Sequence, residues 1–129
     1  PCVSRRARAI SGTIARMADV DETRDELLRL TWAQVRGWTP ENLMNLPAAR
    51  RLLEGGASSM ELATAMNAAA YEAVFGLLAL LDERADPDGE SDDDSWALVD
   101  PESNQSIDGL HEDLLAADPT GQEGQDLFA

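Results

Sequence analysis

Cysteine and histidine are almost absent from this sequence. The only cysteine, Cys2, excludes an internal disulfide framework and a cysteine-rich zinc site. The only histidine, His111, begins the letters HEDLL, which match the start of a zincin helix, but Leu115 stands where the second histidine is needed. The sequence also lacks a GxxxxGK phosphate loop and a GxGxxG fingerprint. We therefore expect a protein that is not an enzyme, with no catalytic residue and no cofactor.

Aromatic residues make up only 5% of the chain, and its 43% of hydrophobic residues are mostly alanine and leucine. This composition favours helices over sheets. The longest uninterrupted apolar run covers residues 73–81, whereas about 20 residues are needed to span a bilayer. No apolar segment of the signal-peptide type is visible either. The sequence thus predicts a cytoplasmic protein without a membrane partner.

Lysine is entirely absent, so arginine supplies all ten basic residues, which is typical of high-GC bacterial or phage genomes. The net charge of −15 is unevenly distributed. Residues 1–51 have a net charge of +3, from nine arginines and six acids, and residues 52–129 have a net charge of −18, from one arginine and nineteen acids. A negative field disfavours binding to nucleic acid and favours a cationic partner, although solubility alone is the simpler explanation of such charge runs.

Hydrophobic periodicity predicts a mainly α protein, a small bundle of four to five helices around a long central helix at about residues 58–84. The first predicted helix has an apolar seam with spacings of 4, 3, 4 and 3, formed by Val3, Ala7, Ile10, Ile14 and Met17. Four arginines, Arg5, Arg6, Arg8 and Arg16, lie off this seam. A second helix at about 22–37 places Leu28, Trp32 and Val35 on one side.

The predicted central helix has two apolar stripes, and only a narrow polar remainder separates them. One stripe consists of Leu62, Met66, Ala69, Ala73, Leu77 and Leu80, and the other of Ala63, Ala70, Val74, Leu78 and Leu81. A helix that is apolar on most of its circumference is typical of the middle of a bundle, so we expect neighbours on both stripes.

The acidic C-terminal part predicts a short β-hairpin, with SWALVD and NQSI as its strands, followed by a short helix. We accordingly divide the chain into a helical bundle at 1–84, an acidic hairpin and helix at 85–118 packed on the same domain, and a frayed tail at 119–129.

An acidic stretch between the central helix and the hairpin has the composition of a calcium loop. Asp86, Asp88 and Asp92 are the candidate metal ligands, grouped around a turn at Gly89. Alignment with an EF-hand, however, places an arginine at the first ligand position and a serine at the last. We therefore expect incidental binding of Ca²⁺ or Mg²⁺ and no dedicated metal site.

Three functions are consistent with the sequence. The first is a non-catalytic inhibitor, immunity or regulatory protein, a DNA mimic among them, which presents carboxylates to a cationic protein. Its candidate contact residues are Asp92, Asp93, Asp94, Trp96, Glu112 and Asp113. The second is a structural protein that forms homo-oligomers through the N-terminal seam. The third is a small enzyme that uses a metal or carboxylates.

Overall fold

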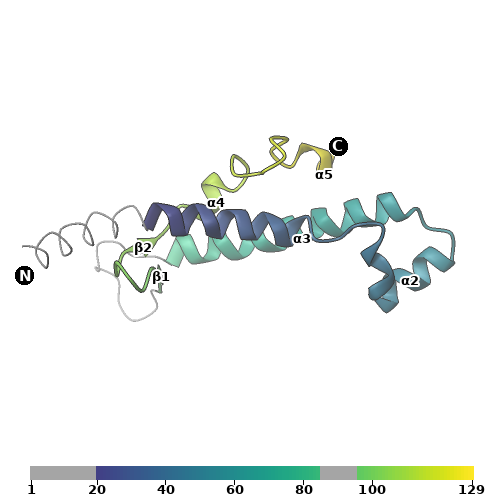
Figure 1. Cartoon of the computed structure of the whole chain (residues 1–129), viewed down its shortest axis with the longest axis horizontal. Helices are drawn as coiled ribbons and strands as arrows, with labels where there is room; N and C mark the ends of the chain where they lie inside the picture. Colours follow the sequence, from purple (N-terminus) through teal and green to yellow (C-terminus); the bar gives the residue numbers. More distant parts are fainter. Residues whose placement is uncertain (1–19, 85–95) are drawn as a thin grey trace, which may run out of the picture.

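A computed structural model of the chain describes residues 20–84 and 96–129. These residues are mainly helical and include one short two-stranded sheet, so the predicted fold class is confirmed. Figure 1 shows an elongated molecule in which a helix at residues 20–35, hereafter the first helix, lies alongside the long helix α3 (Ser59–Arg84). The predicted N-terminal seam and the candidate metal ligands lie outside the described residues.

The main hydrophobic core lies between the first helix, α3 and the C-terminal segment. Leu28, Trp32 and Val35 are all buried, as their spacing predicts, because positions four and three residues apart share one side of a helix. From α3, Tyr71 and Leu78 complete this part of the core, and the ring centroids of Trp32 and Tyr71 are 5.7 Å apart. Gly37 follows the helix, where a side chain would come within 3.0 Å of a carbonyl oxygen of the last turn.

The connection from the first helix to α3 forms a second, smaller cluster at the other end of the molecule. It contains the 3-10 helix η1 (Asn42–Asn45) and helix α2 (Pro47–Glu54), which begins at a proline as predicted. The buried side chains of this cluster are Leu43, Ala49 and Ala63. Asn67 of α3 fixes the connection, because its side-chain amide accepts a hydrogen bond from the Trp38 backbone amide and donates one to the Trp38 carbonyl oxygen, at 3.0 and 2.9 Å.

The predicted hairpin is present. Strand β1 (Leu98–Val99) pairs antiparallel with β2 (Ser106–Ile107), with Leu98 opposite Ile107. Asp100 organises the turn, since its carboxylate accepts hydrogen bonds from the backbone and hydroxyl groups of Ser103. Hydrogen bonds from the hydroxyl and the backbone amide of Ser103 lower the pKa of Asp100. Burial raises this pKa, but its effect is smaller.

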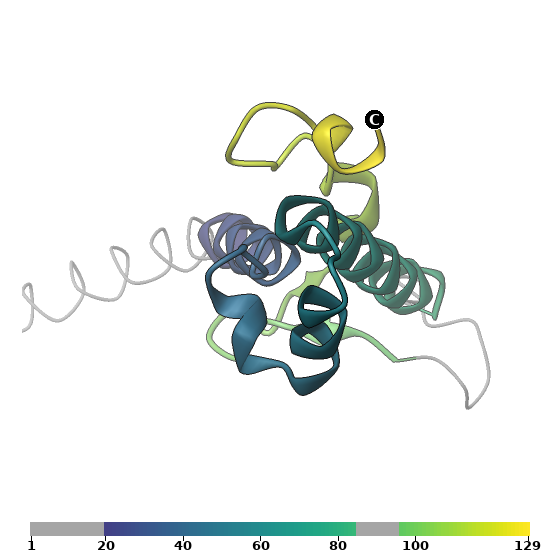
Figure 2. The same cartoon turned by 90° about the vertical axis from the view of Figure 1, so that its right-hand side faces the viewer.

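The C-terminal segment crosses one side of the first helix and α3 (Figures 1 and 2). It begins with α4 (Leu110–Asp113), whose Leu110 is buried together with Leu114 just beyond it. Residues 119–129, which we expected to fray, instead lead to a short helix, α5 (Gln125–Phe128), with Leu127 in the main core. This difference arises from long-range contacts, because Arg36 of the first helix is hydrogen-bonded to Asp118 and Asp126 at the two ends of this segment.

Candidate interaction surfaces

The two apolar stripes of α3 have different environments. Ala63 and Leu78 of one stripe are buried, and Val74 and Leu81 are half-buried against the main core. On the opposite side of the helix, Ala65, Ala69, Ala73, Gly76, Leu77 and Leu80 are exposed, and we call these six residues the outer face. Neighbours on both stripes were expected. Leu62 and Met66, at the start of the other stripe, are half-buried against the smaller cluster, but the rest of that stripe is exposed. The first helix and the C-terminal segment lie beside α3 (Figure 2) and pack against its other side, which carries Tyr71 and Leu78.

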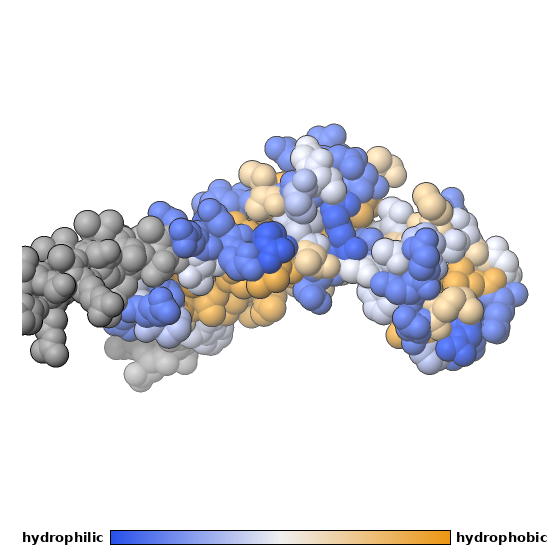
Figure 3. All heavy atoms as spheres, in the orientation of Figure 1, coloured by the Kyte–Doolittle hydropathy of each residue, from blue (hydrophilic) through white to orange (hydrophobic). Residues whose placement is uncertain are grey.

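The outer face is unusually apolar for an exposed helix surface. Leu77 is 56% exposed and Leu80 is 44% exposed, and the other four residues of the face are alanine or glycine. A side chain added at Gly76 would meet nothing within 4 Å. In Figure 3, apolar surface lies along the lower middle of the molecule, where α3 is seen in Figure 1. Contiguous apolar surface of this kind is typical of a site that binds another molecule.

Helix α3 also has the length and apolar composition of a membrane-spanning helix over Ser59–Glu83, counting the described residues alone. The uninterrupted run at residues 73–81 had suggested otherwise, because three glutamates and an aspartate interrupt the longer segment. Only 11% of the most apolar part of this helix is buried. Its composition is thus that of a core helix, whereas its burial is that of a surface helix.

A row of carboxylates borders the outer face. Glu61, Glu72 and Glu83 follow one another at intervals of eleven residues, which is close to three helical turns, or about 16 Å along the axis. All three are exposed, and none forms an ion pair with another described residue. No arginine or lysine occurs between Ser59 and Glu83. The outer face is therefore apolar along its centre and negatively charged along one edge.

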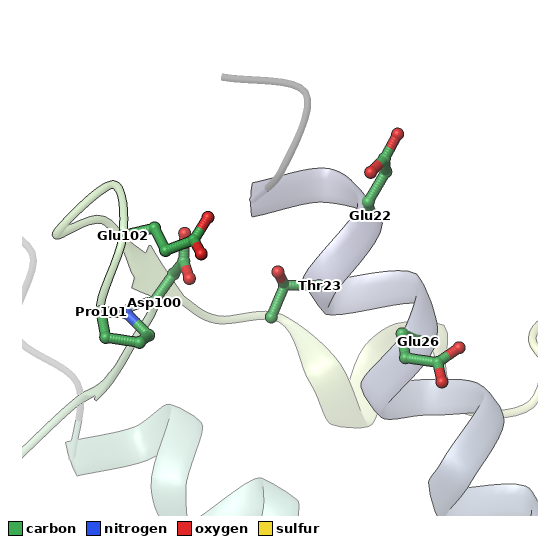
Figure 4. A pocket seen from close by; sticks show the side chains of 6 residues that line it. All are labelled: Glu22, Thr23, Glu26, Asp100, Pro101 and Glu102. Atoms are coloured by element: carbon green, nitrogen blue, oxygen red, sulfur yellow. The ribbon is translucent and has the colours of Figure 1, made fainter. Parts of the chain in front are cut away.

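A second acidic surface is a pocket of about 460 Å³ between the first helix and the hairpin, shown in Figure 4. Its lining residues are Glu22, Thr23, Glu26, Asp100, Pro101 and Glu102. Two of its four carboxylates already have partners: Glu26 accepts hydrogen bonds from Arg29 at 2.6 and 2.8 Å, and Asp100 holds the hairpin turn. Within the described part of the chain, no group of three or more histidines, cysteines or acids has the arrangement to hold a metal ion.

His111 has a structural contact. Its ring and backbone nitrogens are hydrogen-bonded to the carboxylate of Asp82, near the end of α3, and its ring packs edge-on against Phe75 at a centroid distance of 5.8 Å. Burial acts to raise the pKa of Asp82, but the hydrogen bonds from His111 outweigh it and lower the pKa below 3.8. This pair joins α4 to α3.

The six candidate contact residues of the acidic part differ in their environment, and the structure describes three of them. Asp92, Asp93 and Asp94 lie outside the described residues. Asp113 forms an ion pair with Arg24, which also donates a hydrogen bond to the Gly109 carbonyl oxygen at 3.0 Å. Glu112 is exposed and Trp96 is 45% exposed.

The outer face was missing from the contact residues that the sequence suggested, although Ala69, Ala73, Leu77 and Leu80 belong to one of the two predicted apolar stripes. The number and length of the predicted elements could have indicated this exposure. They are too few and too short to cover a 26-residue helix on all sides. Comparison with protein family models, curated proteins and solved structures gives no significant match. The proposals below therefore rest on the geometry and charge of these surfaces.

Proposed function

We propose that this chain is a non-catalytic interaction protein that binds a cationic amphipathic helix of a partner on the outer face of α3. The observation that carries the proposal is the exposure of Leu77 and Leu80 on a helix that has the composition of a buried one. An amphipathic helix laid on a hydrophobic helix surface is a recurring mode of recognition between proteins.

The hydrophobic effect supplies the affinity in this arrangement. Each Å² of apolar surface removed from water contributes about 25 cal/mol, so covering two half-exposed leucines and the neighbouring alanines contributes several kcal/mol. The alanines and Gly76 add a geometric condition, since small side chains let the axis of a second helix approach closely. The partner residues facing them must then be large to fill the space.

The bordering carboxylates indicate that the partner helix should be positively charged. Glu61, Glu72 and Glu83 lie in one row beside the outer face and have no described cationic partner. Arginine or lysine beside the apolar stripe of the partner helix would pair with this row and fix its register. The negative charge of the chain as a whole acts in the same direction by increasing the rate of encounter with a cation.

A titration of the ¹⁵N-labelled full chain with a designed amphipathic helix of leucine and arginine tests this proposal. We expect amide shift changes concentrated on residues 65–80 of α3, and a dissociation constant that rises with salt concentration. The variant Leu77→Gln/Leu80→Gln should weaken binding about tenfold or more, because both side chains lose apolar contact.

Leu52→Gln is the matched control, since Leu52 is 54% exposed on α2, away from the outer face. It should leave the affinity unchanged. Shift changes that avoid α3, or equal affinity for all three proteins, would refute the proposed site. Binding of phosphatidylcholine and phosphatidylglycerol vesicles without any response to the peptide would identify lipid as the occupant and also refute the proposal.

A further inference from the structure

We infer that the helix bound on the outer face of α3 is the N-terminal segment of a second copy of this chain, residues 3–17. The inference rests on the proposed function, because it names the partner of the same surface. It predicts a dimer in which each copy contributes its N-terminal segment to the α3 helix of the other. Such reciprocal contacts satisfy the two-fold symmetry that most homodimers have.

The first argument is the match in length and side-chain size. The seam from Val3 to Met17 extends over fourteen residue steps and the outer face from Ala65 to Leu80 over fifteen, which correspond to about 21 and 23 Å along a helix axis. The seam consists mostly of large side chains, whereas the middle of the outer face consists of Ala69, Ala73 and Gly76. Large residues on one helix and small residues on the other are complementary in shape.

The second argument is charge. Residues 1–19 contain four arginines and one acid, and the outer face is bordered by the carboxylates of Glu61, Glu72 and Glu83. Direct pairing of two α3 helices is less favourable, because it would bring two such rows together with no basic residue between Ser59 and Glu83 of either copy. The N-terminal segment supplies the opposite charge.

The third argument explains why the segment must come from another copy. The first helix lies beside α3 (Figure 2) and shares the main core with Tyr71 and Leu78, which are on the opposite side of α3 from the exposed outer face. Neighbouring helices pack 8–10 Å apart, so a helix on the outer face would lie about 18 Å from the axis of the first helix. Only three residue steps separate Met17 from Val20, which is already helical, and they reach about 11 Å at most. A chain therefore cannot place its own seam on its own outer face.

Cys2 permits a direct test, because it is the only cysteine and it precedes the seam by one residue. A nitroxide is attached to Cys2 of an unlabelled full chain, which is mixed with ¹⁵N-labelled full chain that carries Cys2→Ser. We expect intermolecular loss of amide signal intensity on residues 65–80 of α3, strongest at one end of the outer face. Ile10→Glu/Ile14→Glu in the nitroxide-bearing copy should remove this effect.

Several results would overturn the inference. Broadening confined to the first 19 residues would show that the seams pair with each other, and the absence of intermolecular broadening would show that no such dimer forms. Persistent broadening with Ile10→Glu/Ile14→Glu would show that the seam is not the contact. These outcomes are separable from failure of the proposed function: if the designed helix still binds the outer face, the surface is an interaction site for a different partner, and if it does not, both proposals fail.

Discussion

Replacing Arg36 by methionine is expected to lower the free energy of unfolding by about 3–5 kcal/mol. Arg36 lies over the ring of Trp32, with its guanidinium carbon 5.1 Å from the ring centroid, and holds Asp118 and Asp126 at 2.6 and 2.8 Å. The side chain of Asp118 is completely buried, so its carboxylate would lose the only cationic partner that it has among the described residues. A loss of this size is a large part of the 5–15 kcal/mol that stabilises a typical domain.

A double variant separates the effect of the unpaired buried carboxylate from the effect of lost packing around Arg36. Asp118→Asn in the Arg36→Met background removes the buried charge, so the double variant should be more stable than Arg36→Met alone. Urea unfolding followed by circular dichroism measures both differences. Equal stability of the single and double variants would contradict the view that an unpaired carboxylate causes the loss.

The same ion pair predicts how stability depends on pH. Burial acts to raise the pKa of Asp118, but hydrogen bonds from Arg36 and from the backbone amides of Gly124 and Thr120 outweigh it and lower the pKa from 3.8 to about 2. Because the folded-state pKa is lowered, the contribution is fully present above pH 3.8 and is lost as the pH falls through about 2. In Arg36→Met/Asp118→Asn, the decrease in stability over this pH range should be smaller than in the wild type.

Trp32→Ala is expected to be at least as destabilising, with a loss of about 3–5 kcal/mol from the cavity alone. Trp32 is 0% exposed and donates its indole N–H to the Leu114 carbonyl oxygen at 2.6 Å. The substitution thus removes the largest core side chain and the shorter of two hydrogen bonds to the Leu114 carbonyl oxygen, which keeps the one from the Ala117 backbone amide at 3.2 Å. Thermal unfolding measures the effect, and Trp96→Ala, at a tryptophan that is 45% exposed, is the control with a smaller expected loss. Equal losses for the two variants would contradict this description of the core.

Local patterns in the sequence predicted the elements well. The spacing of Leu28, Trp32 and Val35 predicted the buried side of the first helix, and Pro47 predicted where α2 begins. The strand-like composition of SWALVD, followed by a turn and NQSI, predicted the hairpin. These features depend on residues that are close together in the chain, so a single sequence contains the required information.

The remaining features depend on residues that are far apart in the chain. Both stripes of α3 have helical spacing, so periodicity could not show which one meets the core; the position of the first helix decides it. Likewise, the partners of Arg36 are 82 and 90 residues away, and they hold in place a tail whose composition resembles a frayed end. For the same reason, the sequence suggested the acidic segment as the contact surface, whereas the proposed contact surface is the outer face.

Sedimentation equilibrium of the full chain tests most directly the central claim that a second copy covers the outer face of α3. We predict that the wild type and Leu52→Gln approach twice the chain mass of 13.9 kDa as concentration rises, whereas Leu77→Gln/Leu80→Gln stays at 13.9 kDa. Its unfolding midpoint should equal that of the wild type at concentrations where the wild type is monomeric. A wild type that remains at 13.9 kDa, or an outer-face variant that associates as strongly as the wild type, would contradict the claim.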